Sequence, residues 1–561
     1  MQNYVFFPDS QETQKSVPFG QCEMADRIPC LPCARYIELD VKLAPSRTFL
    51  DRLLALQSDN KADTRRLHAP VINRMPAEIV ARIFSWCIAD YWTEPWTDPI
   101  KRASFLNPLT LGAICWSWRQ IAWSTPRLWT YIKCKFGPDE KPSSSHLEIS
   151  REWLSRSGEM PLAISIKLGT QEHDANRDEY EFSEQMKQDF GPFIDIFNEY
   201  SHRWQCLSIS CPPELLASFT GNPLGSPILE HIGVTPDDFD GNNFYDDEDN
   251  QFKLQAGPPQ PTFAVILDLS LKTLVISYIH VTQVIARGLR ELDCLELILL
   301  APMLERLVLV DAWYSFKTNP NVVSESIIHD RLRDIEIRHQ RDEPSQPFMR
   351  KLFKTLVVPN LKELCLKMLH GHLFCDSLIY LLDRSSCSLK TFIVNDAIYD
   401  DNSMIQLLQS RPSIENLELL PSNGCDHPPE EFLGLFARTK DGTDGTSLQL
   451  DFLPNLKRFK YSVSEPNQIP WQFLADIYGP PTIRQRRPLG ELTMVYRERN
   501  LGHFMDIEKT LTHSDIGKNV LLRLLELEAA NISLYLSKRI RRKDLLDLLQ
   551  EELAVKCAVY E

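Results

Sequence analysis

Residues 301–310 read APMLERLVLV, and the frame L-x-x-L-x-L within them recurs along the chain. Consecutive copies start at positions that lie 28, 29, 28 and 25 residues apart, namely Leu304, Leu332, Leu361, Leu389 and Ile414. Weaker copies read WQCLSIS from Trp204, LEHIGV from Leu229, LKTLVIS from Leu271 and LKRFKYS from Leu456. A period of roughly 20–29 residues is that of leucine-rich repeats.

Each copy predicts a short strand whose alternate leucines face a core, followed by a helix that returns the chain. The segment HLFCDSLIYLLDRS at 372–385 is such a helix candidate. We therefore expect an α/β chain in which residues 147–500 form an irregular leucine-rich-repeat solenoid. An ordinary α/β domain with apolar strands is the alternative, and the regular spacing favours the solenoid.

Two helical patterns precede the repeats. Behind Met75-Pro76, a first pattern carries apolar residues at i, i+4, i+7 and i+8, which are Ile79, Ile83, Trp86 and Cys87. Proline suits a first helical turn, where its missing N–H removes no hydrogen bond. A second pattern predicts one helix of about three turns with a single apolar stripe, formed by Leu111, Ile114, Cys115, Trp118, Ile121 and Ala122.

These two patterns together resemble an F-box, in the form common among fungal (basidiomycete-type) F-box proteins with leucine-rich repeats. The first half matches as Met75-Pro76-x-Glu78-Ile79 with Ile83-Phe84, although Met75 and Val80 stand where the family has leucines. The second half matches at Leu111, Cys115, Trp118-Arg119, Ile121-Ala122 and Pro126-x-Leu128-Trp129. Residues 91–107 lengthen the link between the halves.

The resemblance implies a small bundle of helices that docks on a Skp1-type adaptor and, through it, on a cullin ubiquitin ligase. The repeats would then bind an unknown target protein. The adaptor-binding residues that it implies are Met75, Pro76, Ile79, Ile83, Phe84, Leu111, Cys115 and Trp118. The alternative is a protein-interaction scaffold that uses the F-box fold only structurally. Exposed apolar side chains in this segment would favour the adaptor reading, because a docking site leaves an uncovered patch.

Composition excludes several classes of function. The net charge of −15 argues against a general nucleic-acid binder, which needs a basic face. No run of 18 or more apolar residues predicts a membrane span, and the first residues lack the pattern of a signal peptide. Fourteen cysteines without a framework indicate a reducing compartment. We therefore expect an intracellular protein, cytoplasmic and/or nuclear.

The usual signatures of catalysis and of cofactor binding are missing from the sequence. It contains no P-loop, G-x-G-x-x-G, G-x-S-x-G or H-E-x-x-H motif. Cys30 and Cys33 form a lone C-x-x-C pair, which is read as two free thiols because no second pair follows at zinc-site spacing. We expect no catalytic, cofactor-binding or metal-binding residues and no enzymatic activity.

The remaining stretches complete the expected organisation. Residues 1–45 are expected to be irregular, residues 46–135 to form the F-box region with a leading helix, and residues 501–561 a helical cap based on 517–558. An acidic stretch at 237–249 is read as a solvated loop, with a contact for a basic partner as the alternative. The basic cluster at 538–543 is read as a solvated face, with a nuclear signal or an acidic-partner site as the alternatives.

Overall fold

The computed structural model describes residues 31–67, 72, 75–87, 107–137, 140–169, 184–236, 250–312, 326–339, 346–422, 429–441, 448–463, 471–478, 486–496, 533–538 and 541–544. The chain divides into two compact units after Phe84. The first unit contains α1 (Leu31–Leu67) and the start of α2 (Ala77–Cys87). The second unit contains all other described elements.

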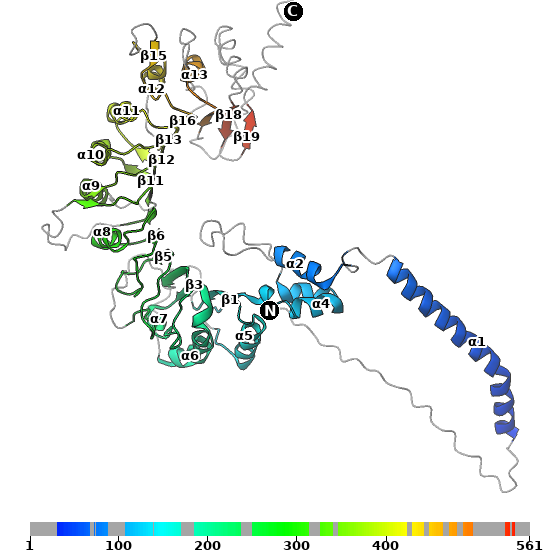
Figure 1. The fold of residues 1–561 in the computed structure, drawn as a ribbon. Helices are drawn as coiled ribbons and strands as arrows, with labels where there is room; N and C mark the ends of the chain where they lie inside the picture. The colour runs from blue at the N-terminus through cyan, green and yellow to red at the C-terminus, as the bar shows by residue number, and fades with distance from the viewer. Residues whose placement is uncertain are drawn as a thin grey trace, which may run out of the picture. The chain divides into compact units, whose positions relative to one another are not determined.

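A single sheet of 15 strands runs through the second unit, and its neighbours follow one another in chain order (Figure 1). All neighbouring strands in it are parallel except the last two, which pair antiparallel. Its strands are β1 (Tyr131–Lys135), β2 (Leu162–Lys167), β3 (Trp204–Cys211), β4 (His231–Pro236), β5 (Phe263–Leu267), β6 (Gln283–Arg287), β7 (Arg306–Val310), β9 (Asp334–His339), β11 (Glu363–His372), β12 (Thr391–Ile398), β13 (Asn416–Pro421), β16 (Arg458–Val463), β17 (Glu491–Tyr496), β18 (Ser533–Lys538) and β19 (Arg541–Asp544).

Two small ribbons accompany this sheet. In one, β8 (Ile327–Ile328) pairs in parallel with β10 (Leu356–Val357). In the other, β14 (Thr439–Asp441) pairs antiparallel with β15 (Leu448–Leu450).

Helices connect the strands, and α8 to α11 lie along one face of the sheet (Figure 1). We call the opposite face, which these helices do not cover, the open face. The helices of the second unit are α3 (Pro108–Ile114), α4 (Trp116–Trp123), η3 (Pro126–Trp129), α5 (Ser144–Arg156), α6 (Glu184–Glu199), η4 (Ser201–Arg203), α7 (Pro213–Leu216), α8 (Glu291–Leu300), α9 (Gln346–Thr355), α10 (Cys375–Ser385), α11 (Asp401–Gln409), α12 (Pro429–Gly434), η5 (Leu435–Ala437) and α13 (Trp471–Tyr478).

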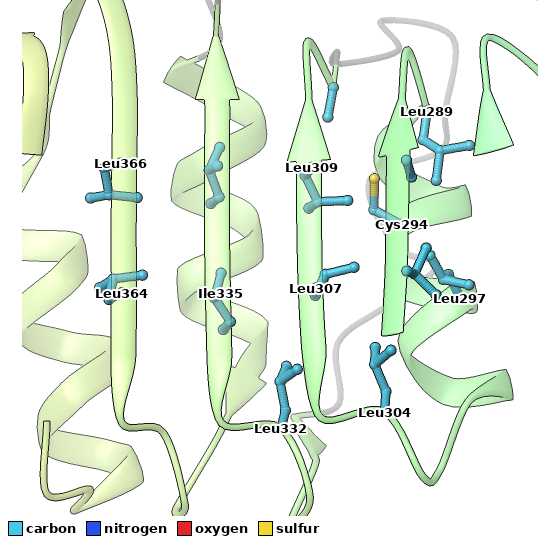
Figure 2. Close-up of a cluster of buried hydrophobic side chains, with 14 of the residues drawn as sticks. Leu289, Cys294, Leu297, Leu304, Leu307, Leu309, Leu332, Ile335, Leu364 and Leu366 are labelled. Atoms are coloured by element: carbon cyan, nitrogen blue, oxygen red, sulfur yellow. The ribbon is translucent and has the colours of Figure 1, made fainter. Parts of the chain in front are cut away.

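The core lies between the sheet and these helices. Leu307 of β7 and Leu364 of β11 are both in register with Ile335 of β9, so their side chains form a level row (Figure 2). Each of these residues is at most 2% exposed. Full burial of such a side chain stabilises the fold by about 1.5 to 3 kcal/mol. Apolar side chains at the same register position of successive strands therefore pack neighbouring strands and their helices together.

The predicted fold class is wrong. A helical F-box bundle followed by a separate solenoid with a helical cap is not what the chain forms. One parallel α/β sheet instead begins at β1, directly after α4 and η3, and continues to β18. The boundary between the two units falls inside α2, so its residues up to Phe84 belong to a different unit from α3 and α4.

Both ends of the chain also differ from expectation. α1 begins at Leu31, inside the stretch that we expected to be irregular. Within the expected C-terminal helix, residues 533–538 form β18, which pairs in parallel with β17. The segment SLYLSK alternates leucine with other residues, which is the period of a strand, and this local pattern overrides the helical one around it.

Candidate functional site

The first half of the F-box-like segment forms α2, whose two sides differ in exposure. Val80 and Phe84 are buried, at 2% and 1% exposure, whereas Ile79 is 46% exposed. Of the other predicted residues here, Pro76 is exposed, and Met75 and Ile83 are half-buried. Phe84 is therefore a core residue of this segment, and Ile79 is the predicted residue best placed to meet a partner.

The second half forms two short helices rather than the single helix that we predicted. Asn107 caps α3, because its side-chain oxygen accepts a hydrogen bond from the Leu109 N–H at 2.7 Å. The chain then breaks at Cys115, whose backbone is extended (φ −158°, ψ 167°). The Cys115 Sγ accepts from the Trp118 N–H at 3.4 Å and so caps α4.

This break changes which side chains face outward. Leu111, which the resemblance places at the adaptor site, is buried, and Cys115 and Trp118 are half-buried. Ile114, which the single-helix pattern placed in the apolar stripe, is 57% exposed, and Trp116 is 73% exposed. Because α4 restarts after the break, the apolar stripe of the sequence does not continue from α3 into α4.

Large apolar side chains are exposed in both halves of the segment. They are Ile79, Trp86, Leu109, Ile114 and Trp116, with exposed fractions between 46% and 75%. The sequence placed Ile79 at the adaptor site but did not single out the other four for binding. Exposed aromatic and aliphatic side chains of this size are typical of protein-binding sites.

Helices α3 and α4 pack closely against each other. A Cβ atom added at Gly112 would lie 2.1 Å from Cζ3 of Trp123, so the indole ring rests directly on the glycine. The Arg119 side chain donates from Nε to the Gly112 carbonyl at 2.9 Å. Glycine is required here because the ring leaves no room for a side chain.

A cluster of three tryptophans joins this helix pair to the start of the sheet. The ring centroids of Trp123 and Trp129 lie 5.2 Å apart, and those of Trp129 and Trp153 lie 4.8 Å apart, each pair edge to face. The Arg156 guanidinium lies 5.1 Å from the Trp129 ring centroid. Trp153 Nε1 donates to the carbonyl of Tyr131, the first residue of β1, at 3.1 Å. These contacts fix the orientation of α4 relative to β1 and α5.

The open face of the sheet carries a shared ion-pair network centred on Glu336. Its carboxylate accepts from Arg338 Nε at 2.8 Å and from Lys367 Nζ at 2.6 Å, and Arg306 lies 3.9 Å away. Burial alone would raise the pKa of the Glu336 carboxyl, but the hydrogen bonds from Arg338 and Lys367 bring it below its ordinary value. The Glu336 carboxylate thus forms ion pairs with three cationic side chains, which lie on β7, β9 and β11.

Other acidic groups near the beginnings of the strands differ in their surroundings. Burial raises the pKa of Asp334 and of Glu363, which stand directly opposite each other on β9 and β11. Glu415 accepts from Lys390 at 2.6 Å and from Lys457 at 2.5 Å, and these hydrogen bonds lower its pKa to about 2. The open face is therefore rich in charge, and its acids cluster near the beginnings of the strands.

Several cysteine side chains among the described residues are buried. Burial raises the pKa of the Cys206 and Cys375 thiols to about 12, so both are protonated at neutral pH. The described ranges contain no group of three His, Cys, Asp or Glu side chains placed to hold a metal ion. None of the described helices combines the length and apolar character needed to cross a bilayer.

Some predicted features lie outside the described residues. These are Cys30 of the C-x-x-C pair, the acidic stretch 237–249, residue Arg539 of the basic cluster, residues 91–106 of the link, and residues 517–532 and 545–558 of the expected C-terminal helix.

The sequence matches no family model and no curated protein.

Proposed function

We propose that this protein is a non-enzymatic target-recognition subunit of a cullin-based ubiquitin ligase, acting inside the cell. Residues 75–87 and residues 107–123 each contact a Skp1-type adaptor, and the open face of the sheet binds the target protein. The proposal does not require a helical F-box bundle. It requires only that the adaptor buries the exposed apolar side chains of each of these two stretches.

The observation that carries the proposal is the exposure of large apolar side chains in the segment that resembles an F-box. Ile79, Ile114 and Trp116 are 46%, 57% and 73% exposed. A residue that served only to pack the protein itself would be buried. Their exposure favours a docking role over the scaffold alternative, in which the segment is purely structural.

The α3–α4 pair is also held firmly to the sheet, which suits a protein that presents a target at a set position. The tryptophan cluster around Trp129 links α4 to β1 and α5.

Binding to a purified Skp1-type adaptor should depend on Ile79 and Trp116. We expect the wild-type chain to form a one-to-one complex in isothermal titration calorimetry. Ile79→Asp together with Trp116→Asp should weaken binding at least about a hundredfold, because each change places a charge in an apolar contact. Both residues are exposed, so the variant should keep its fold, whereas changes at buried Phe84 or Leu111 would disturb it.

A matched control replaces two other exposed apolar residues, Leu224 and Ile279, which are 70% and 58% exposed. Leu224→Asp with Ile279→Asp should leave adaptor binding unchanged. If the wild-type chain is folded by circular dichroism and binds no adaptor, or if both double variants lose binding equally, the proposal is wrong.

A further inference from the structure

Helix α1, which is 37 residues long, carries exposed apolar side chains along one side (Figure 1). Each is between 45% and 64% exposed, and they are Leu39, Leu43, Phe49, Leu50, Leu53, Leu54 and Leu56. We call these seven residues the α1 stripe. With 3.6 residues per turn, the stripe occupies a sector of about 160° of the helix. Soluble proteins seldom leave so many large apolar side chains together in solvent, so the stripe indicates a docking surface.

The stripe follows the seven-residue repeat of helices that pair with other helices. If Leu43 and Leu50 take position a, then Leu39 and Leu53 take position d, and Ser46 takes the d position between them. The remaining three residues of the stripe stand at positions e and g, which flank the contact in such pairs. The stripe therefore fits another helix as its partner.

An antiparallel pairing of two α1 helices brings residues of like character together. When two identical helices run in opposite directions about a two-fold axis, the residue numbers of opposed positions have a constant sum. Placing Leu50 opposite Leu53 of a second copy sets this sum at 103 for the core positions, so Ser46 meets Gln57. On one flank the sum is 105, and Phe49 meets Leu56 of the second copy. The apolar centre of the contact thus lies between polar pairs.

Charges toward both ends of the contact favour the same direction. The sum is 101 on the other flank, where Asp40 stands opposite Lys61 of the second copy, and the sum of 105 places Lys42 opposite Asp63. The two-fold axis repeats each pair, so opposite charges meet at four places. Lys42 also pairs with Glu38 of its own helix at 2.5 Å, but both side chains are more than 60% exposed, and an ammonium has three hydrogens to donate.

A parallel pairing of the same helices would be less favourable. Each core residue would then meet its own counterpart, so Ser46 and Gln57 would each face a copy of themselves. Lys42 at position g would stand beside Arg47 at position e of the second copy, which brings two positive charges together. Pro45, the proline inside α1, stands at position c, on the side away from the partner in either direction.

We infer that α1 forms an antiparallel coiled coil with α1 of a second copy of this chain, so that the protein is a homodimer. The paired stretch extends from residue 39 to residue 64, which is about 39 Å of helix. This inference goes beyond the proposed function and does not depend on it, because it concerns a helix that precedes the two adaptor-binding stretches.

The test uses the full chain without any adaptor, so its outcome is separate from that of the adaptor experiment. Size-exclusion chromatography with light scattering gives the mass in solution, and sedimentation equilibrium over a range of dilutions gives the dissociation constant. We expect twice the mass of one chain at micromolar concentrations and a shift toward the mass of one chain on dilution.

Charges in the centre of the stripe should separate the two copies. Leu50→Asp with Leu53→Asp should weaken dimerisation at least about a hundredfold, because the dimer would bury four carboxylates in an apolar contact. The control is Leu31→Asp with Val41→Asp on the same helix, where the native residues are 79% and 67% exposed. Leu31 lies beyond the paired stretch and Val41 on the opposite side of the helix, so this control should dimerise to within about twofold of wild type. Circular dichroism compares the helix content of both variants.

Charge reversal tests the direction of the pairing. Lys42→Asp with Lys61→Asp places like charges at all four contacts and should weaken dimerisation about tenfold. Adding Asp40→Lys and Asp63→Lys to this variant should restore dimerisation to within about twofold of wild type. The Glu38–Lys42 pair is lost in both variants, so the difference between them reports on contacts between the two copies.

Three results would overturn the dimer. They are the mass of one chain at every concentration, a dimer that survives the change at Leu50 and Leu53, and an equal loss in the control. A fourfold charge variant that dimerises no better than the twofold one would overturn the antiparallel direction. A dimeric chain that binds no adaptor would keep the α1 contact and refute only the ligase role.

Discussion

Replacing Arg487 by methionine is expected to lower the free energy of unfolding by about 3 to 5 kcal/mol. Arg487 is 2% exposed and donates to four backbone carbonyls. These are the carbonyls of Leu453 at 3.0 Å, Asp476 at 3.3 Å, Ile477 at 2.8 Å and Phe452. Methionine fills similar volume but leaves these buried acceptors without their donor, and each such loss costs about 1 to 3 kcal/mol.

The position of these carbonyls explains why an arginine stands there. Asp476 and Ile477 lie in the last turn of α13, whose carbonyls have no partner within the helix and form its negative end. Burial lowers the pKa of Arg487 to about 9, so the guanidinium remains charged at neutral pH. Its planar fork reaches several acceptors at once, which a lysine cannot do.

Urea denaturation followed by circular dichroism measures this effect. Arg487→Lys should be nearly as damaging as Arg487→Met, because a single ammonium cannot replace the fork. Arg486→Met, at the half-buried neighbouring position, should cost about 1 kcal/mol or less. A loss below about 1 kcal/mol in Arg487→Met would contradict the structural role given to this side chain.

The second large effect is expected at Lys351, on the ion pair between α8 and α9. Glu291 is 1% exposed, and its carboxylate pairs with the Lys351 ammonium. Lys351→Met should lower the free energy of unfolding by about 3 to 5 kcal/mol, because it leaves a buried carboxylate without its cation. The same urea titration measures the change.

Removing both partners distinguishes this explanation from a loss of packing. The double variant Glu291→Leu with Lys351→Met should recover most of the lost stability, since no unpaired charge remains. Lys354→Met, three residues further along α9 and exposed, should change stability by less than about 0.5 kcal/mol. A double variant less stable than Lys351→Met would show that the carboxylate is not the cause.

The sequence predicted the strands well where leucines alternate. The copies of L-x-x-L-x-L form strands β7, β9, β11, β12, β13 and β16. Leu307, Ile335 and Leu364 are buried, as the pattern requires. The pattern identifies each strand from the alternation of buried apolar residues within it, and this alternation is a local property of the sequence. It does not show how far a sheet extends, so the strands outside the expected bounds 147–500, which are β1, β18 and β19, were not predicted.

The adaptor segment was predicted less well, because one backbone break decides which residues are exposed. Helical periodicity placed Ile114 and Trp118 on the same stripe, but the extended backbone at Cys115 interrupts the helix. A cysteine that caps a helix leaves no clear sequence signal, since serine, threonine, aspartate and asparagine are the usual caps. The exposure of Trp116 follows from this break in the helix, so it could not be predicted from a sequence pattern that does not reveal the break.

The ion-pair network around Glu336 is invisible in the sequence for a different reason. Arg306, Glu336 and Lys367 are about 30 positions apart along the chain and stand in three different strands. Only the parallel register of β7, β9 and β11 brings them together. At the other end, the helical pattern of residues 517–558 hid the strand-like alternation of SLYLSK, which forms β18.

Hydrogen–deuterium exchange of the full chain, with and without a Skp1-type adaptor, tests the central claim most directly. We predict slower exchange in the complex at residues 75–87 and 107–123, which carry Ile79, Ile114 and Trp116. Exchange in β9, β11, β12 and β13 should be the same with and without adaptor, because the open face is left for the target. Unchanged exchange in both segments, or protection only on the sheet strands, would contradict the account.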